Sequence, residues 1–217
     1  MLKFRQFILR EETSVPHDLT FMRANPFHIG HESVVKQVTD SADANGGGHT
    51  VLLSRTQDPK KNPLTPEQKL HWAKKSFPGA NIQLTTPDSP TLLHHLSKLH
   101  NDGVTDVNLH VGSDRVPEFK QLASTYNGVQ GRHGYYNFKS INVHPVGETR
   151  DDEATSGIAG ASATAMRNAA QAGDRDRFHA MAPSNLNTTE KDQLMSQVHA
   201  GMNPPPEEKP TKPKAKK

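Results

Sequence analysis

The chain alternates short apolar runs with longer segments that have helical spacing or helix-start signals. The short runs have the length and composition of buried strands and cover residues 18–23, 49–55, 81–86, 106–112 and 140–146. The longer segments cover residues 31–44, 64–77, 89–103, 116–126, 162–173, 174–183 and 188–200. Strands that alternate with helices predict an α/β fold. We therefore expect a Rossmann-like, doubly wound, parallel five-stranded sheet with helices on both faces.

One helix has an unusually complete start signal. Thr65 stands where an N-cap is expected, Pro66 follows at the first helical position, and Gln68 completes a capping box. Trp72 shares this helix with other apolar residues, and we expect it in the core rather than in a base-binding surface.

Composition limits the domain organisation. The 217 residues are 32% hydrophobic and 23% charged, which suits one domain with small appendages. We expect an N-terminal segment at 1–17, a folded domain at 18–200 and a disordered tail at 201–217. The chain has no cysteine, which excludes disulfides, thiolate metal sites and thiol nucleophiles.

The net charge of +3 comes from one end of the chain. The last fifteen residues hold five Lys and two Glu, so the remainder sums to about zero. We therefore expect nucleic-acid binding only weakly, through the tail. The chain has no apolar run near the ~20 residues of a membrane span, and its N-terminus lacks a secretory signal. These features predict a cytoplasmic protein with no membrane partner.

The stretch FMRANPFHIGH carries the first candidate chemistry. His28 and His31 lie between the first predicted strand and its helix, with Gly30 between them. In a parallel sheet this turn lies at the carboxyl edge, where ligands bind. Imidazoles beside a helix N-terminus can donate hydrogen bonds to phosphate oxygens. The turn therefore predicts a phosphate-binding site.

Two later stretches supply further candidates. In ASATAMR, Ser162 and Thr164 open a helix, and Arg167 lies one turn on as a bidentate cation. In VGSDR, Gly112 and Asp114 close the fourth predicted strand at the same edge. An ordinary Gly-Ser-Asp turn remains an alternative for the second stretch.

These motifs resemble the nucleotidylyltransferase superfamily with the H-x-G-H signature, and most closely its nicotinamide mononucleotide adenylyltransferase branch. The branch opening typically reads G-R-F-Q-P-F-H-x-G-H. The residues that match it are Arg23, Pro26, Phe27, His28, Gly30 and His31, while Ala24 and Asn25 replace F-Q. Ser162, Thr164 and Arg167 are similar to the late S-x-T-x-x-R motif of the superfamily. The resemblance covers about residues 18–180.

The resemblance implies in-line attack of a nucleotide phosphate on the α-phosphorus of ATP or CTP, with release of pyrophosphate. His28 and His31 would then stabilise the reacting phosphate, and Ser162, Thr164 and Arg167 would hold the β- and γ-phosphates. Nucleotide contacts would also come from Arg23, Gly30, Gly112 and Asp114. Mg²⁺ would bridge phosphate oxygens and need few protein ligands. No site for a protein-bound metal is expected.

The N-terminus carries a second resemblance. MLKFRQFILREE is similar to the capsid-targeting segments of internal proteins in T-even-type phages, with Phe4, Phe7 and Ile8 in the matching places. An amphipathic helix that docks on the domain is the alternative. The phage resemblance implies a phage-encoded protein in the host cytoplasm, with packaging in the virion and a capsid partner as a further option.

Several functions stay open. The leading hypothesis is adenylylation of a small phosphorylated acceptor such as nicotinamide mononucleotide. A cytidylyltransferase that uses CTP, and a non-enzymatic phage virion protein that retains the fold, are alternatives. HIGH is also the signature of class I aminoacyl-tRNA synthetases, but the chain is short for one and lacks a K-M-S-K-S-like loop. The sequence leaves a homo-oligomer open.

Overall fold

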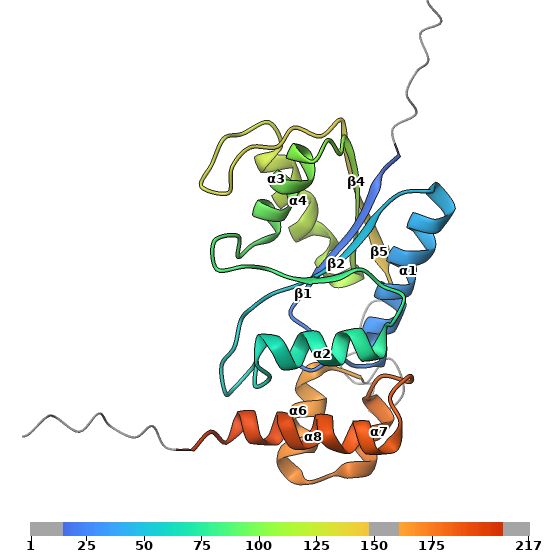
Figure 1. Ribbon diagram of the computed structural model, residues 1–217, viewed down its shortest axis with the longest axis vertical. Helices are drawn as coiled ribbons and strands as arrows, with labels where there is room; N and C mark the ends of the chain where they lie inside the picture. The colour runs from blue at the N-terminus through green and yellow to red at the C-terminus, as the bar shows by residue number, and fades with distance from the viewer. Residues whose placement is uncertain (1–14, 148–160, 206–217) are drawn as a thin grey trace, which may run out of the picture. The chain divides into compact units, whose positions relative to one another are not determined.

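The computed structural model describes residues 15–147 and 161–205 (Figure 1). In chain order the elements are β1 (His17–Met22), α1 (Ile29–Asn45), β2 (His49–Leu53), α2 (Pro66–Ser76), β3 (Ile82–Leu84), α3 (Leu92–Asn101), β4 (Asp106–Gly112), the short 3₁₀ helix η1 (Ser113–Arg115), α4 (Val116–Tyr126), β5 (Ser140–Val146), α6 (Ala163–Ala172), α7 (Arg175–Met181) and α8 (Thr188–Met202). Every predicted strand and helix forms. The ends of β4, α4 and β5 are as predicted, and those of the other elements are shifted.

The five strands form one parallel sheet in the order β3-β2-β1-β4-β5. β1 pairs in parallel with β2 on one side and with β4 on the other. The strand order therefore reverses between β1 and β4, and this is the switch point at which Rossmann-like sheets bind ligands. The predicted α/β class and parallel five-stranded sheet are confirmed.

By its internal contacts, the chain divides into two compact units. Within the described residues, the first unit comprises 15–22, 33–54 and 79–147, and the second comprises 23–32, 55–78 and 161–205. The first unit contains the sheet, α3, α4 and most of α1. The second contains α2, α6, α7, α8 and the turn that starts α1.

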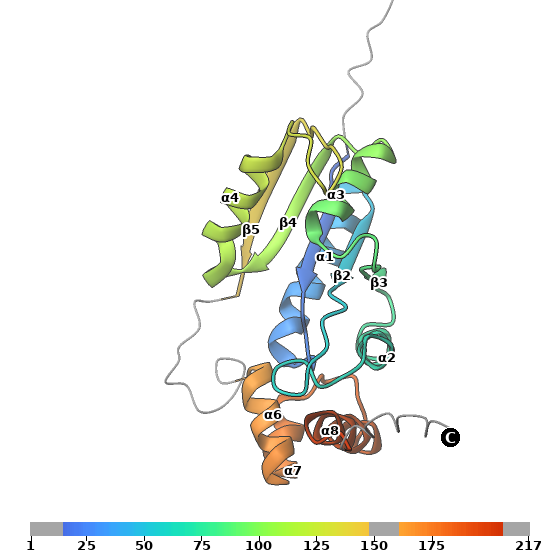
Figure 2. The ribbon, with the colours of Figure 1, turned by 90° about the vertical axis from the view of Figure 1, so that its left-hand side faces the viewer.

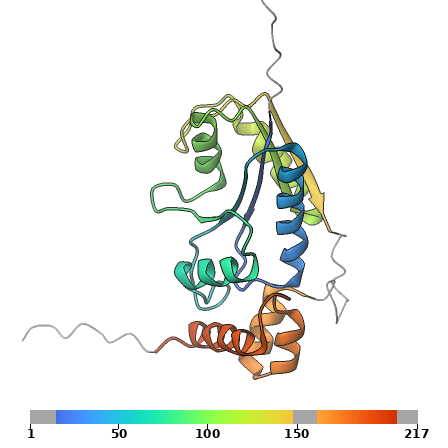
Figure 3. The same cartoon turned by 45° about the vertical axis from the view of Figure 1, so that its right-hand side comes forward.

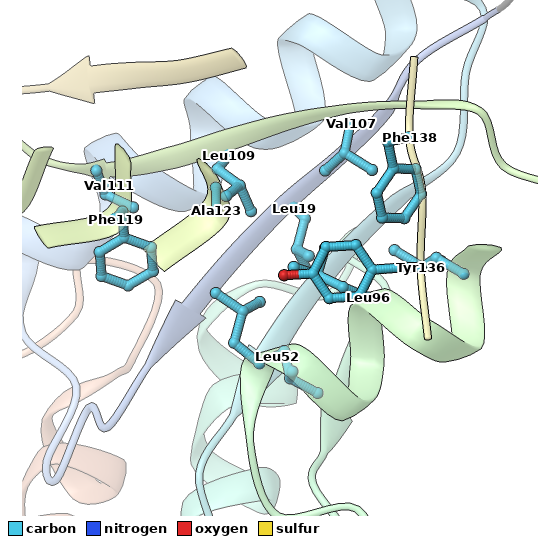
Figure 4. Packing of buried hydrophobic residues seen from close by; sticks show 12 residues of the cluster. Leu19, Leu52, Leu96, Val107, Leu109, Val111, Phe119, Ala123, Tyr136 and Phe138 are labelled. Atoms are coloured by element: carbon cyan, nitrogen blue, oxygen red, sulfur yellow. The ribbon is translucent and has the colours of Figure 1, made fainter. Parts of the chain in front are cut away.

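The core of the first unit lies between the sheet and helices α3 and α4. Figure 4 shows its side chains, among them Leu19, Leu52, Leu96, Leu109 and Phe119. Leu19, Leu52 and Leu109 come from strands, whose successive side chains point to opposite faces. Leu96 comes from α3 and Phe119 from α4. Helix α4 runs along β4 and β5 on this side (Figure 2), whereas α1 covers the other face (Figure 3).

The α1 face of the sheet includes a buried polar group. Asp18 and His110 are almost completely buried, and Asp18 Oδ1 lies 2.6 Å from His110 Nε2. Asn108 Nδ2 also approaches Asp18 Oδ1, at 3.3 Å. Burial lowers the pKa of His110, and the hydrogen bond to Asp18 opposes that shift. The sheet therefore contains a histidine whose protonation opposes folding.

The second unit has a separate core. Trp72, Met166, Phe178 and Leu194 are at most 1% exposed and pack together with residues of α2, α6, α7 and α8. Trp72 lies in this core as predicted, and its Nε1 donates to Gln197 Oε1 at 2.8 Å. Both halves of the predicted capping box at Thr65 are formed.

Two sequence expectations fall largely outside the described residues. The stretch with the phage resemblance, residues 1–12, lies outside the described residues. The expected N-terminal segment 1–17 is described only from residue 15 on, and its last residue, His17, begins β1. Helix α8 continues to Met202, and residues 206–217 of the expected tail are not described. None of the helices in the described ranges has the length and apolar character needed to cross a membrane.

Candidate functional site

The histidine turn between β1 and α1 arranges two imidazoles against each other. The His28 and His31 rings lie 3.8 Å apart between centroids. The backbone N–H of Gly30 donates to His28 Nδ1 at 3.1 Å, and the N–H of His28 donates to His31 Nδ1 at 3.2 Å. A ring nitrogen that accepts a hydrogen bond carries no proton, so the N–H of each neutral ring is on Nε2. The turn therefore sets both histidines as Nε2–H donors.

Glycine is required within this turn because of the neighbouring ring. A Cβ atom on Gly30 would lie 2.9 Å from both Cε1 and Nδ1 of His28. We expected Gly30 to allow close backbone approach, and the group that approaches in this structure is the His28 imidazole. His28 itself is only 2% exposed, so its ring has little room to move.

The late helix α6 begins as its sequence predicts. Ser162 is the N-cap, and its Oγ accepts from Ala165 N at 3.0 Å. Arg167, one turn further, donates from Nη2 to Thr164 Oγ1 at 3.0 Å and from Nη1 to the backbone oxygen of Asn25 at 2.9 Å. Arg167 and Asn25 are 142 residues apart in sequence, so folding brings the late motif to the histidine turn.

Burial affects the charge on Arg167. The side chain is partly buried, and this burial lowers its pKa, while the nearby Asp58 carboxylate raises it. A guanidinium stays protonated through such shifts. Arg167 is therefore a partly desolvated permanent cation, which strengthens its attraction for phosphate.

Asn25 is the residue that sequence reasoning missed. It entered only as a departure from the family pattern, yet its side chain joins two segments. Nδ2 donates to Leu64 O at 3.0 Å, and Oδ1 accepts from Leu64 N at 2.9 Å. The Asn25–Pro26 peptide bond is cis. The partner lies 39 residues away, and no local signal in the sequence joins the two segments.

The loop before α2 is held by its own carboxylate. Asp58 accepts from the backbone N–H groups of Lys60 and Lys61 at 3.0 and 2.7 Å. The hydrogen bond from the Asn62 side chain, and then these backbone bonds, lower the pKa of Asp58. Lys69, on the adjoining helix, is fully buried. Burial first, and then the charge of Arg55, lower the pKa of Lys69 to about 8.

The remaining predicted residues are placed differently. Arg23 is exposed in the second unit, just before the histidine turn. Gly112 and Asp114 belong to the first unit, where Asp114 is exposed in the short helix η1. The second unit thus brings together six predicted residues, namely His28, Gly30, His31, Ser162, Thr164 and Arg167. The catalytic and nucleotide-binding roles of all nine predicted residues, these six together with Arg23, Gly112 and Asp114, stay predictions.

Two other features do not add to this cluster. A cavity of about 550 Å³ in the first unit is lined by residues of α4, of β5 and of the loop between them, such as Lys120, His144 and Lys139, and by none of the predicted site residues. Across the described ranges, no group of three or more His, Asp or Glu side chains could hold a metal ion.

Comparison with known proteins gives a fold likeness alone. No protein-family model matches the chain, and no curated protein matches it. Among solved structures, it is similar to apo TmcAL from Thermotoga maritima, with 12% identity and a TM-score of 0.50 over 87% of this chain and 58% of that one. The chain thus spans less than two thirds of that protein.

Two further solved structures have slightly lower TM-scores. TmcAL bound with alpha-thio ATP gives 13% identity and 0.49, over 86% of this chain and 57% of that one. Nicotinic acid mononucleotide adenylyltransferase from Plasmodium falciparum, complexed with NaAD, gives 14% identity and 0.48, over 83% of this chain and 97% of that one.

Proposed function

We propose that this protein is a nucleotidylyltransferase that transfers AMP from ATP to a small phosphorylated acceptor such as nicotinamide mononucleotide, with release of pyrophosphate. The observation that carries the proposal is the hydrogen bond from Arg167 to the Asn25 carbonyl. It joins the H-x-G-H turn and the S-x-T-x-x-R helix into one cluster of phosphate-binding groups. Each motif alone is weak, and their meeting in space supports a common ligand.

In this proposal the two histidines act on the reacting phosphate. Their Nε2–H groups donate to oxygens of the α-phosphate, where negative charge develops as the acceptor phosphate attacks. The attacking phosphate is already anionic, so the step needs little acid–base chemistry. The new P–O bond forms on the α-phosphorus while the bond to the β-phosphate oxygen breaks. Catalysis then depends on alignment and charge stabilisation.

The late helix acts on the leaving group. Arg167, Thr164 and the N-terminus of α6 bind the β- and γ-phosphates, which depart as pyrophosphate. Mg²⁺ would enter with the nucleotide as MgATP and would neutralise part of the phosphate charge. The proposal includes no capsid role, because the segment that suggested one lies outside the described residues.

The test is a binding and turnover panel. The intact protein is titrated by calorimetry with MgATP, MgCTP and nicotinamide mononucleotide, and pyrophosphate release is followed for each pair. MgATP should bind and raise the melting temperature. At a hundredfold excess over Kd, binding adds about 2.7 kcal/mol to the free energy of unfolding. Arg167→Lys keeps the charge but loses the bidentate fork. We expect it to weaken ATP binding about tenfold and leave the acceptor's affinity unchanged.

Arg177→Lys is the matched control, because Arg177 is exposed on α7 in the same unit. It should leave both affinities as in the wild type. Binding and turnover with CTP alone would replace the proposal with a cytidylyltransferase. Absence of binding to either triphosphate would reject nucleotidylyl transfer. A lower acceptor affinity with unchanged ATP affinity in Arg167→Lys would show that Arg167 and the N-terminus of α6 bind the acceptor instead of the triphosphate.

A further inference from the structure

We propose that Asn25 is a positioning residue that fixes Arg167 in the orientation needed to bind a triphosphate. The inference rests on the proposed function and adds a residue to it that no motif supplies. Asn25 does not contact the phosphates in this proposal. It acts through its own backbone carbonyl, which accepts a hydrogen bond from Nη1 of Arg167.

The side chain of Asn25 is fully committed to the fold. It is 2% exposed, and Leu64, its partner, is 1% exposed. Its amide donates to the Leu64 carbonyl and accepts from the Leu64 N–H, so the pair satisfies one buried donor and one buried acceptor of the main chain. Removing the amide would leave both Leu64 groups without these bonds inside the protein, so the two segments would separate or admit water.

The backbone at this point requires such support. Ala24, the residue before Asn25, has a φ of 41°, in the left-handed region that a residue with a Cβ rarely adopts. A strained conformation persists only where surrounding contacts determine it. The pair of hydrogen bonds between Asn25 and Leu64 is such a contact, one residue away. The position of the Asn25 carbonyl therefore depends on the Asn25 side chain.

Arg167 depends in turn on that carbonyl. Nη1 donates to Asn25 O, and Nη2 donates to Thr164 Oγ1, so two N–H groups on different nitrogens hold the plane of the guanidinium. Within the described part of the chain, the structure gives no hydrogen-bond partner to its other three N–H groups. A guanidinium has five such donors, and a fixed plane is what bidentate phosphate binding requires. Loss of the Asn25 contact would free the plane to rotate.

A double-mutant cycle tests this chain of contacts. ATP and nicotinamide mononucleotide are titrated separately into the wild type, Asn25→Ala, Arg167→Ala and the double variant. We expect Asn25→Ala to weaken ATP binding about tenfold in the wild-type background and less than about twofold when Arg167 is already absent. The acceptor's affinity should change less than about twofold in all four proteins. Asn25→Asp, which keeps the acceptor and loses the donor, should give the same pattern.

Asn185→Ala is the matched control. Asn185 also donates its amide to a buried carbonyl in the second unit, that of Ser76, but touches neither motif. It should lower the melting temperature without changing either affinity. Equal losses of ATP affinity with and without Arg167 would overturn the inference, as would a loss in Asn185→Ala equal to that in Asn25→Ala.

A readout that needs no nucleotide separates this inference from the proposed function. The Arg167 Nη1–H signal in NMR, from the group that donates to Asn25 O, should exchange faster and broaden in Asn25→Ala, and should stay sharp in Asn185→Ala. If the wild type binds no ATP but this signal responds as expected, the proposed function fails and the positioning role stands. If ATP binds the wild type and Asn25→Ala alike, the positioning role fails and the proposed function stands. An unchanged Arg167 signal in Asn25→Ala also overturns the positioning role.

Discussion

The burial of His95 should make the first unit sensitive to acid. His95 lies on α3, is 8% exposed, and its Nε2 is buried without a hydrogen-bond partner among the described residues. Burial first, and then the nearby charges of His17 and Lys98, lower its pKa from the ordinary value of 6.5 to about 4, against an opposing effect of Asp102. The folded protein therefore resists protonation that the unfolded chain accepts.

The size of the effect follows from the two pKa values. Between pH 6.5 and 4 the unfolded state binds more protons, so the free energy of unfolding falls as the pH falls. Above pH 6.5 the titration of His95 does not reduce the free energy of unfolding. At pH 5 it should reduce that free energy by about 2 kcal/mol, and below pH 4 by about 3 kcal/mol. A difference of that size is a large part of the stability of a small domain.

Urea unfolding followed by far-UV circular dichroism at pH 7.5, 6 and 5 measures this loss. His95→Gln removes the buried imidazole and should lose about 2 kcal/mol less than the wild type between pH 7.5 and 5. His17 and His110, whose pKa values burial also lowers, remain in both proteins. His94→Gln is the control, since it removes a half-exposed imidazole from the same helix. Parallel pH profiles for the wild type and His95→Gln, or an equal effect in His94→Gln, would refute the burial argument.

Three further substitutions test the second unit. His31→Ala should lower kcat about 10²–10³-fold in the pyrophosphate-release assay, because it removes one hydrogen-bond donor to the charge that develops on the α-phosphate. It should leave the melting temperature unchanged. Gly30→Ala should lower turnover about a hundredfold, because its Cβ would come within 2.9 Å of the His28 ring and displace it. Gly201→Ala should lower stability by about 1–3 kcal/mol in thermal unfolding, because its Cβ would lie 2.1 Å from the Pro63 carbonyl oxygen.

Each of these has a contrary outcome. Near-wild-type kcat in His31→Ala would remove that residue from the chemistry. Unchanged turnover in Gly30→Ala would mean that the His28 ring moves freely or has no catalytic role. An unchanged melting temperature in Gly201→Ala would mean that α8 does not pack against the loop at Pro63 as tightly as the structure has it.

Local patterns determined most of the fold. The apolar runs have the period and length of buried strands, and the helix starts carry their own capping groups, as Thr65 and Ser162 do. These signals involve neighbours a few residues apart, so they can be read from the sequence. The spacing of His28 and His31 around a glycine also predicts a phosphate-binding turn without any structure.

Tertiary structure decided how the motifs are held together. In the sequence, Asn25 was only a departure from the family pattern. In the structure its side-chain amide hydrogen-bonds to Leu64, 39 residues away, and its carbonyl accepts from Arg167, 142 residues away. The sequence likewise could not show that His95 is buried while His94 is half-exposed, because both lie on one amphipathic helix. Hydrogen bonds between distant segments and the burial of one face of a helix depend on which surfaces meet. Local spacing does not contain that information, since it records only the neighbours of each residue along the chain.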